Sequence, residues 1–213
     1  MMKISDNPEQ DEDEAEFFIN SLIHAREPIG LESSLRFMAH LCENYDTDPE
    51  ITDLVDNREF YFVPVINPDG YEYNRQTNPN GGGMWRKNRN LTGFVDLNRN
   101  WGYMWGYDDD GSSPDPGDET YRGMAPFSEP ETSSLRQFIN SRNFNLIMNF
   151  HAYGDILLYP WGYYDGHTPD NEIFRALSDL ACTENGYEFG TPWELLYNTN
   201  GDATDWQYGE QEE

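Results

Sequence analysis

The chain has 213 residues, with 40 acidic and 13 basic side chains and a formal net charge of −27. This charge excludes an unaided nucleic-acid binder, because phosphate recognition needs clustered Lys and Arg. With 37% hydrophobic and 15% aromatic residues the chain can still bury a core, and its length is typical of one domain. We therefore expect a single domain over residues 1–213, monomeric, with no nucleic-acid partner.

The sequence offers little on location. No apolar run approaches the roughly 18 residues that span a bilayer, so no membrane insertion is expected, and the start lacks the regions of a signal peptide. Cys42 and Cys182 lie in expected helices without metal-like spacing, which predicts buried free thiols. The acidity suits a protein adapted to high salt, although ordinary solvation by Asp and Glu gives the same composition.

The first half of the chain predicts a strand, a helix and a second strand. Residues 17–23 form a short apolar run, and apolar residues at helical spacing from 31 to 42 follow Pro28, which suits a first helical turn. Residues 60–66 predict a buried strand, and residues 67–70, Asn-Pro-Asp-Gly, are typical of a turn directly after it. Residues 71–123 are expected to be mostly loop.

The second half continues the alternation. Ser128 is expected to cap a helix that begins with Pro130 and has Glu131 in a capping box. Residues 146–150 predict a buried strand that ends at His151. A short strand over 155–159 and a helix over about 169–185, stopped by Gly186, follow. This order predicts an α/β fold with a mixed, mostly parallel central sheet flanked by helices.

Basic residues gather in one expected loop. Five of the 13 basic side chains fall between residues 75 and 99, which suggests an anion site, although compensation of the acidic surface is the alternative. They are Arg75, Arg86, Lys87, Arg89 and Arg99.

Two histidines and a glutamate stand at the ends of expected strands. His24 and Glu27 follow the first strand, and His151 closes a later one. Two imidazoles and one carboxylate suit zinc with an open position for water. The His-x-x-Glu spacing alone is weak evidence, because it arises by chance in acidic sequences.

Four longer motifs, in order along the chain, strengthen this interpretation. They are His24-Ala25-Arg26-Glu27, Trp85-Arg86-Lys87-Asn88-Arg89, Val95-Asp96-Leu97-Asn98-Arg99-Asn100-Trp101 and Phe150-His151-Ala152-Tyr153. With these motifs the chain resembles the zinc metallocarboxypeptidases of the carboxypeptidase A/B (M14) family. The resemblance implies that family's α/β fold, here incomplete, and a hydrolase that removes the C-terminal residue from peptides and proteins.

The resemblance also implies roles for individual residues. His24, Glu27 and His151 would bind one zinc ion, and Arg89 would stabilise the oxyanion of the reaction. The substrate would be held by the terminal-carboxylate pair Asn98 and Arg99, by the mobile Tyr197, by Arg86 and Tyr153 before the scissile bond, and by Thr204 at the floor of the terminal pocket. A threonine floor predicts a neutral or broad preference, with Asp202 replacing a small residue nearby.

The same resemblance places the general-base glutamate beyond residue 213 and a further strand and helix before Met2. We therefore expect a core fragment with poor activity, since losing a general base commonly costs about 10²–10⁴ in rate. Two alternatives stay open: a non-catalytic module that binds peptide C-termini and a zinc amidase of the same fold. Calcium at Asp108–Asp110 or residues 11–14 is possible, with solvated surface the better expectation. Family resemblance suggests secretion.

Overall fold

The computed structural model describes residues 1–210, which form two compact units. The first comprises Met1–Arg86 and Ser134–Ala152, and the second comprises Lys87–Ser133 and the chain from Tyr153 onward. Each unit is described by itself below. The expectation of one domain over the whole chain stays a prediction.

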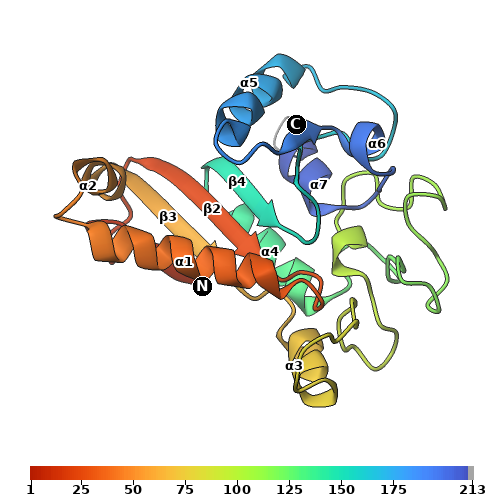
Figure 1. Cartoon of the computed structure of the whole chain (residues 1–213). Helices are drawn as coiled ribbons and strands as arrows, with labels where there is room; N and C mark the ends of the chain where they lie inside the picture. The colour runs from red at the N-terminus through yellow and green to blue at the C-terminus, as the bar shows by residue number, and fades with distance from the viewer. Residues whose placement is uncertain (211–213) are drawn as a thin grey trace. The chain divides into compact units, whose positions relative to one another are not determined.

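The first unit is built on a four-stranded sheet of order β1-β3-β2-β4 (Figure 1). β1 (Met2–Ile4) runs antiparallel to β3 (Arg58–Val63). β2 (Ala15–Ser21) is parallel both to β3 and to β4 (Phe144–Phe150). The predicted mixed, mostly parallel sheet is confirmed.

Period-two alternation along the strands gives the sheet two packed faces. On one face, Ile19 of β2 and Phe62 of β3 form a buried cluster with Leu41 of α1 (Pro28–Asn44) and Val55 of α2 (Pro49–Asp56). On the other face, Phe18 and Tyr61 contact Phe138 of α4 (Pro130–Ile139), with ring centroids 5.4 and 5.7 Å apart. The sheet is therefore fixed from both sides.

Glu59 is a charged residue inside this core. Its side chain is fully buried and accepts hydrogen bonds from Lys3 Nζ at 2.6 Å, Tyr61 Oη at 2.6 Å and Glu12 N at 2.9 Å. Burial alone raises the pKa of the Glu59 carboxyl, but the hydrogen bonds from Lys3 and Tyr61 outweigh burial, so the pKa lies below its usual 4.5.

A lowered folded-state pKa means that this carboxylate stabilises the fold above pH 4.5 and loses that effect as the pH falls through the folded-state pKa. We expect Glu59→Gln to lower the free energy of unfolding by about 1–3 kcal/mol near neutral pH. Urea unfolding of the variant and of the unaltered chain, at neutral and at acidic pH, measures this difference in free energy. A deficit that stays the same in acid would contradict the role of the charge.

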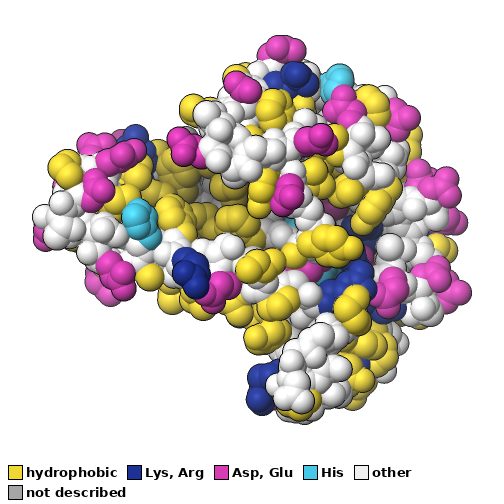
Figure 2. All heavy atoms as spheres, viewed as in Figure 1, with side chains coloured by type: hydrophobic (Ala, Val, Ile, Leu, Met, Phe, Trp, Pro, Cys, Tyr) yellow, Lys and Arg dark blue, Asp and Glu magenta, His cyan; other side chains and the backbone are white. Residues whose placement is uncertain are grey.

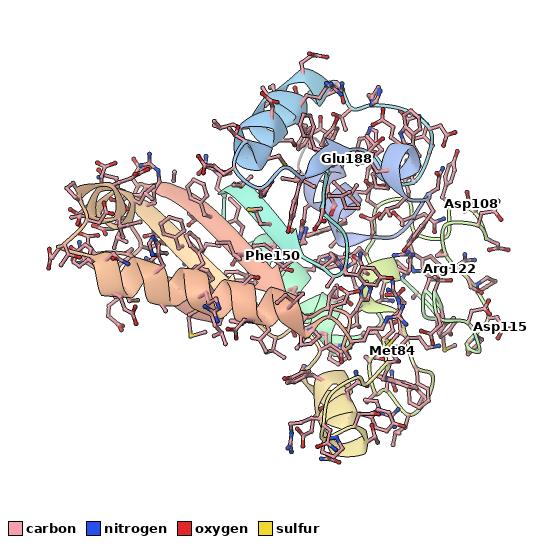
Figure 3. The ribbon with its side chains drawn as sticks, viewed as in Figure 1. Met84, Asp108, Asp115, Arg122, Phe150 and Glu188 are labelled. Atoms are coloured by element: carbon pink, nitrogen blue, oxygen red, sulfur yellow. The ribbon has the colours of Figure 1, made fainter. Side chains whose placement is uncertain are left out.

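The second unit is rich in loops. β5 (Ile156–Leu158) pairs in parallel with β6 (Glu188–Gly190), and four short helices accompany them: η1 (Leu97–Arg99), α5 (Asn171–Cys182), α6 (Pro192–Leu195) and α7 (Ala203–Gly209). Trp101, Phe127 and Trp206 form its aromatic centre. Arg122 ties the loops together by donating to the Asp108 carbonyl at 3.0 Å, and Figure 3 labels both residues.

One expected feature near a helix start is wrong. Asn67 to Gly70 do not form a turn before a loop. They begin α3 (Pro68–Thr77), because Asn67 Oδ1 accepts from Gly70 N as a cap and Pro68 fits the first helical position. α4 begins at Pro130 as expected. The Ser128 hydroxyl donates to the Glu129 carboxylate, and its role as the cap of α4 stays a prediction.

Two burial expectations are also wrong. β4 is not a buried strand, since Leu146 is 41% exposed, Asn145 is exposed as well and the other residues of the strand are half-buried. The reason is its place at the edge of the sheet among the described residues. Cys42 is exposed because it lies on the solvent side of α1, whereas Cys182 is buried as expected and both thiols are free.

Acidic side chains are scattered over the visible face, with few basic ones among them (Figure 2). Lys87 and Arg99 are buried, so part of the scarce positive charge is used inside the protein. In the part of the chain that the structure describes, no helix is both long and apolar enough to cross a bilayer.

Candidate functional site

The three predicted zinc ligands meet in the first unit. His24 Nδ1 lies 2.8 Å from Glu27 Oε1, His151 Nδ1 lies 3.0 Å from Glu27 Oε2, and the two nitrogens are 3.2 Å apart. His24 and Glu27 are buried, whereas the His151 side chain is 35% exposed. Donors this close are within reach of one ion bound about 2 Å from each. The residues therefore fit zinc, with access from one side.

The electrostatics of this donor set favour a cation. Burial acts to raise the pKa of the Glu27 carboxyl, but hydrogen bonds from His151 and His24 outweigh it and hold that pKa well below its usual 4.5. The pKa of His151 is lowered, first by desolvation, although Glu27 opposes this. The lowered pKa of Glu27 keeps its carboxylate charged, which is the form in which glutamate binds metal.

Backbone contacts hold the loop that carries His24 and Glu27. Ala25 N donates to the Arg86 carbonyl at 3.0 Å, and Asn74 Nδ2 donates to the carbonyls of Ala25 at 3.0 Å and Trp85 at 2.8 Å. Asn67 Nδ2 donates to the Ile23 carbonyl at 3.2 Å. The sequence did not mark either asparagine as part of the site, since residues 67–70 predict a turn and nothing in the pattern distinguishes Asn74.

Arg86 lies against the donor set. Its Nη1 is 3.3 Å from His24 Nδ1 and 3.9 Å from Glu27 Oε1, and the residue is buried. The sequence predicted a substrate-binding place for Arg86. A buried guanidinium here is suited to bind a carbonyl or anion that approaches the ion.

The second unit holds the predicted carboxylate-binding pair. Arg99 is 2% exposed, and its Nε donates to the Gly111 carbonyl at 2.8 Å while Nη1 donates to the Asn98 carbonyl at 2.6 Å. Asn98 Oδ1 accepts from Ala203 N at 3.0 Å, at the start of α7. The guanidinium is thus held in one orientation by its own chain.

The other predicted residues of this unit are more exposed. Tyr197 is 56% exposed between α6 and α7, and Tyr153 is fully exposed. The Arg89 guanidinium lies 4.7 Å from the centroid of the Phe94 ring. Thr204, half-buried on the first turn of α7, follows Ala203 directly. Their roles toward substrate stay predictions.

Acidic clusters are present away from these residues. Carboxylate oxygens of Asp6, Glu12 and Glu14 lie within 4.8 Å of one another. Burial and the neighbouring Glu12 raise the pKa of the Glu14 carboxyl. Asp108 Oδ1 accepts hydrogen bonds from Gly111 N and Asn200 Nδ2, both at 2.8 Å, which is the role of a loop stabiliser. Solvated surface, and not calcium binding, stays the expectation for both acidic segments.

Two imidazoles and a carboxylate at the edge of an α/β sheet define the donor set of a zinc hydrolase. The sequence matches the zinc carboxypeptidase family over residues 1–212, and the chain belongs to this family. Carboxypeptidase A1 of Mus musculus is 34% identical over 205 residues, which cover 91% of this chain and 48% of the relative.

Two further comparisons agree. A zinc carboxypeptidase of Saccharothrix mutabilis subsp. capreolus is 35% identical over 224 residues, covering 98% of this chain and 50% of the relative. The crystal structure of thrombin-activatable fibrinolysis inhibitor superposes with a TM-score of 0.88 at 30% identity, covering 98% of this chain and 54% of that one. This chain therefore spans about half the length of the curated relatives it matches.

Proposed function

We propose that the whole protein is a zinc metallocarboxypeptidase that hydrolyses the last peptide bond of peptides and proteins. The observation that carries the proposal is the convergence of His24, Glu27 and His151 on one point, with nitrogen and oxygen atoms 2.8 to 3.2 Å apart. One bound zinc ion would polarise the scissile carbonyl and activate water. Family membership supports this reading, and secretion remains a prediction that accompanies it.

The chain's own residues supply binding and orientation. Arg99 presents a guanidinium fixed by two carbonyls, which suits bidentate bonding to a terminal carboxylate. Asn98 supplies amide donors beside it. An internal peptide brings no carboxylate, so it gains none of this charge-assisted bonding, and the protein acts at chain ends. Arg86 and Arg89 are the candidates to stabilise the oxyanion, and Tyr197 is the candidate to cover the terminal residue.

The test is a pair of peptides that differ only in a free or amidated C-terminus, titrated into the zinc-loaded chain by calorimetry. We expect the free acid to bind at least tenfold more tightly, equivalent to about 1.4 kcal/mol. Equal affinity for acid and amide would contradict recognition of chain ends. Release of the terminal amino acid by the whole protein then separates an enzyme from a binding module.

We further propose that the terminal pocket has a neutral or broad preference because Thr204 carries no charge. The same calorimetry with free-acid peptides ending in Leu, Phe, Lys or Glu measures this. Affinities within about tenfold of one another, equivalent to about 1.4 kcal/mol, are expected, because an uncharged floor offers an ion pair to none of these side chains. A preference for Lys by more than a hundredfold would contradict it.

A further inference from the structure

The second unit contains a buried carboxylate, Asp202, next to the residues expected to bind a terminal carboxylate. Asp202 is 4% exposed and is the N-cap of α7. Its Oδ1 accepts a hydrogen bond from Asp205 N at 2.9 Å, and its Oδ2 accepts one from the Thr199 hydroxyl. Both oxygens therefore bind groups of the protein itself, on the helix and on the preceding loop.

α7, the helix that Asp202 caps, contacts the segment carrying Asn98 and Arg99 through the first residue of the helix, Ala203. Ala203 N donates to Asn98 Oδ1, and Trp101 N donates to the Gly201 carbonyl at 2.9 Å. The first bond fixes which way the Asn98 amide faces. Because Oδ1 is taken by the helix, the amide NH₂ group is the part of this side chain available to donate to a ligand.

We propose that Asp202 is a positioning residue for terminal-carboxylate binding. It holds the first turn of α7 so that Ala203 orients Asn98 beside Arg99, and it does not serve as the counter-ion for a basic terminal residue. This inference rests on the proposed function, because it assumes that Asn98 and Arg99 bind the substrate's carboxylate.

The surroundings of the neighbouring carboxylate support this division of roles. Asp205 is 1% exposed and accepts from Gly162 N at 2.8 Å and Tyr163 N at 3.1 Å. Burial, and then the charge of Asp202, raise the pKa of the Asp205 carboxyl well above its usual value. The oxygens of both side chains therefore accept hydrogen bonds from amide and hydroxyl groups of the protein itself, and Thr204 between them in the sequence carries no charge.

Three variants test the proposal with matched controls. Asp202→Ala removes the cap, whereas Asp202→Asn keeps an acceptor for Asp205 N, since Asn and Asp cap helices about equally well. Ala203→Pro leaves the cap, removes the N–H that orients Asn98, and places the proline ring carbon where Asn98 Oδ1 now lies, so the Asn98 amide must turn away. Proline suits this first helical position, and the preceding Asp202 has the extended backbone that proline requires (φ −89°, ψ 165°).

The measurement is the affinity ratio of free-acid to amidated Leu-terminated peptide for each zinc-loaded variant. We expect Asp202→Ala and Ala203→Pro to reduce the ratio at least about fivefold, the loss of roughly 1 kcal/mol. Asp202→Asn should keep the ratio and leave the relative affinity for Lys-terminated peptide unchanged. Zinc content and thermal unfolding of every variant separate this local effect from unfolding, since the zinc ligands lie in the other unit.

Three results would overturn the inference. An unchanged acid-to-amide ratio in a folded Ala203→Pro variant would show that Asn98 needs no orientation by α7. If Asp202→Asn selectively lowered the affinity for Lys-terminated peptide, Asp202 would be a counter-ion for a basic terminal residue. If the unaltered chain does not distinguish acid from amide, the proposed function fails and the role of Asp202 fails with it.

Discussion

Replacing His151 with alanine is expected to reduce the zinc content of the purified chain from about one ion to near zero. The reason is the size of the donor set, because three protein ligands are the usual complement of an open zinc site and two rarely suffice. His151 supplies a nitrogen 3.2 Å from that of His24, and no other histidine belongs to this cluster of the described residues. Elemental analysis after dialysis against micromolar zinc measures the change.

His40→Ala is the matched control. His40 is exposed on α1 and contacts Asn44 rather than the donor set. Its removal should leave the zinc content unchanged. If both variants kept their zinc, the ion would bind elsewhere and the ligand assignment would be wrong. If the unaltered chain bound none, the donor set would not hold zinc in this chain.

Arg99→Ala is expected to cause the second large effect. Truncating one partner of a buried charge pair costs about 2–5 kcal/mol of binding, so affinity for a free-acid peptide should fall by roughly 30-fold or more. The fold also loses the bonds to the carbonyls of Gly111 and Asn98. We therefore expect a lower melting temperature as well, because an unpaired buried carbonyl costs about 1–3 kcal/mol.

Two further variants separate binding from stability. Arg99→Lys keeps the charge but cannot reproduce the planar fork, so it should bind the free acid with intermediate affinity. Arg75→Ala removes an exposed arginine that pairs with Glu72 on the same helix, at 2.6 Å. This control should change neither the affinity for the free-acid peptide nor the melting temperature. Equal loss of affinity for acid and amide in Arg99→Ala would contradict a carboxylate-binding role.

The sequence predicted the sheet and its flanking helix because their apolar spacing is long and regular. It missed α2, although Asp48 caps it and Pro49 begins it, because the apolar pattern there is short. It took the start of α3 for a turn, since Asn and Pro serve both structures and only tertiary contacts decide between them. It called β4 buried, since an apolar run does not show whether a strand lies inside a sheet or at its edge.

The candidate site, like the fold, could be predicted from the sequence only in part. The convergence of His24, Glu27 and His151 was predictable, because two strand ends and a motif order constrain them. The contact of Arg86 with His24 was not, since the direction of a long side chain depends on packing between distant segments. The cap made by Asp202 was also missed, because its sequence position suggests a pocket charge as readily as a helix start.

The acidity of the chain also affects how the exposed edge of β4 behaves. Among the described residues β4 is an edge strand, and an edge strand with exposed apolar side chains such as Leu146 offers unpaired backbone groups to another molecule. Copies of this 213-residue chain that each carry a net charge of −27 repel one another before such edges meet. Protonating the carboxylates removes that repulsion. For this chain taken by itself, acidification is therefore expected to favour self-association through β4, which the surface charge opposes near neutral pH.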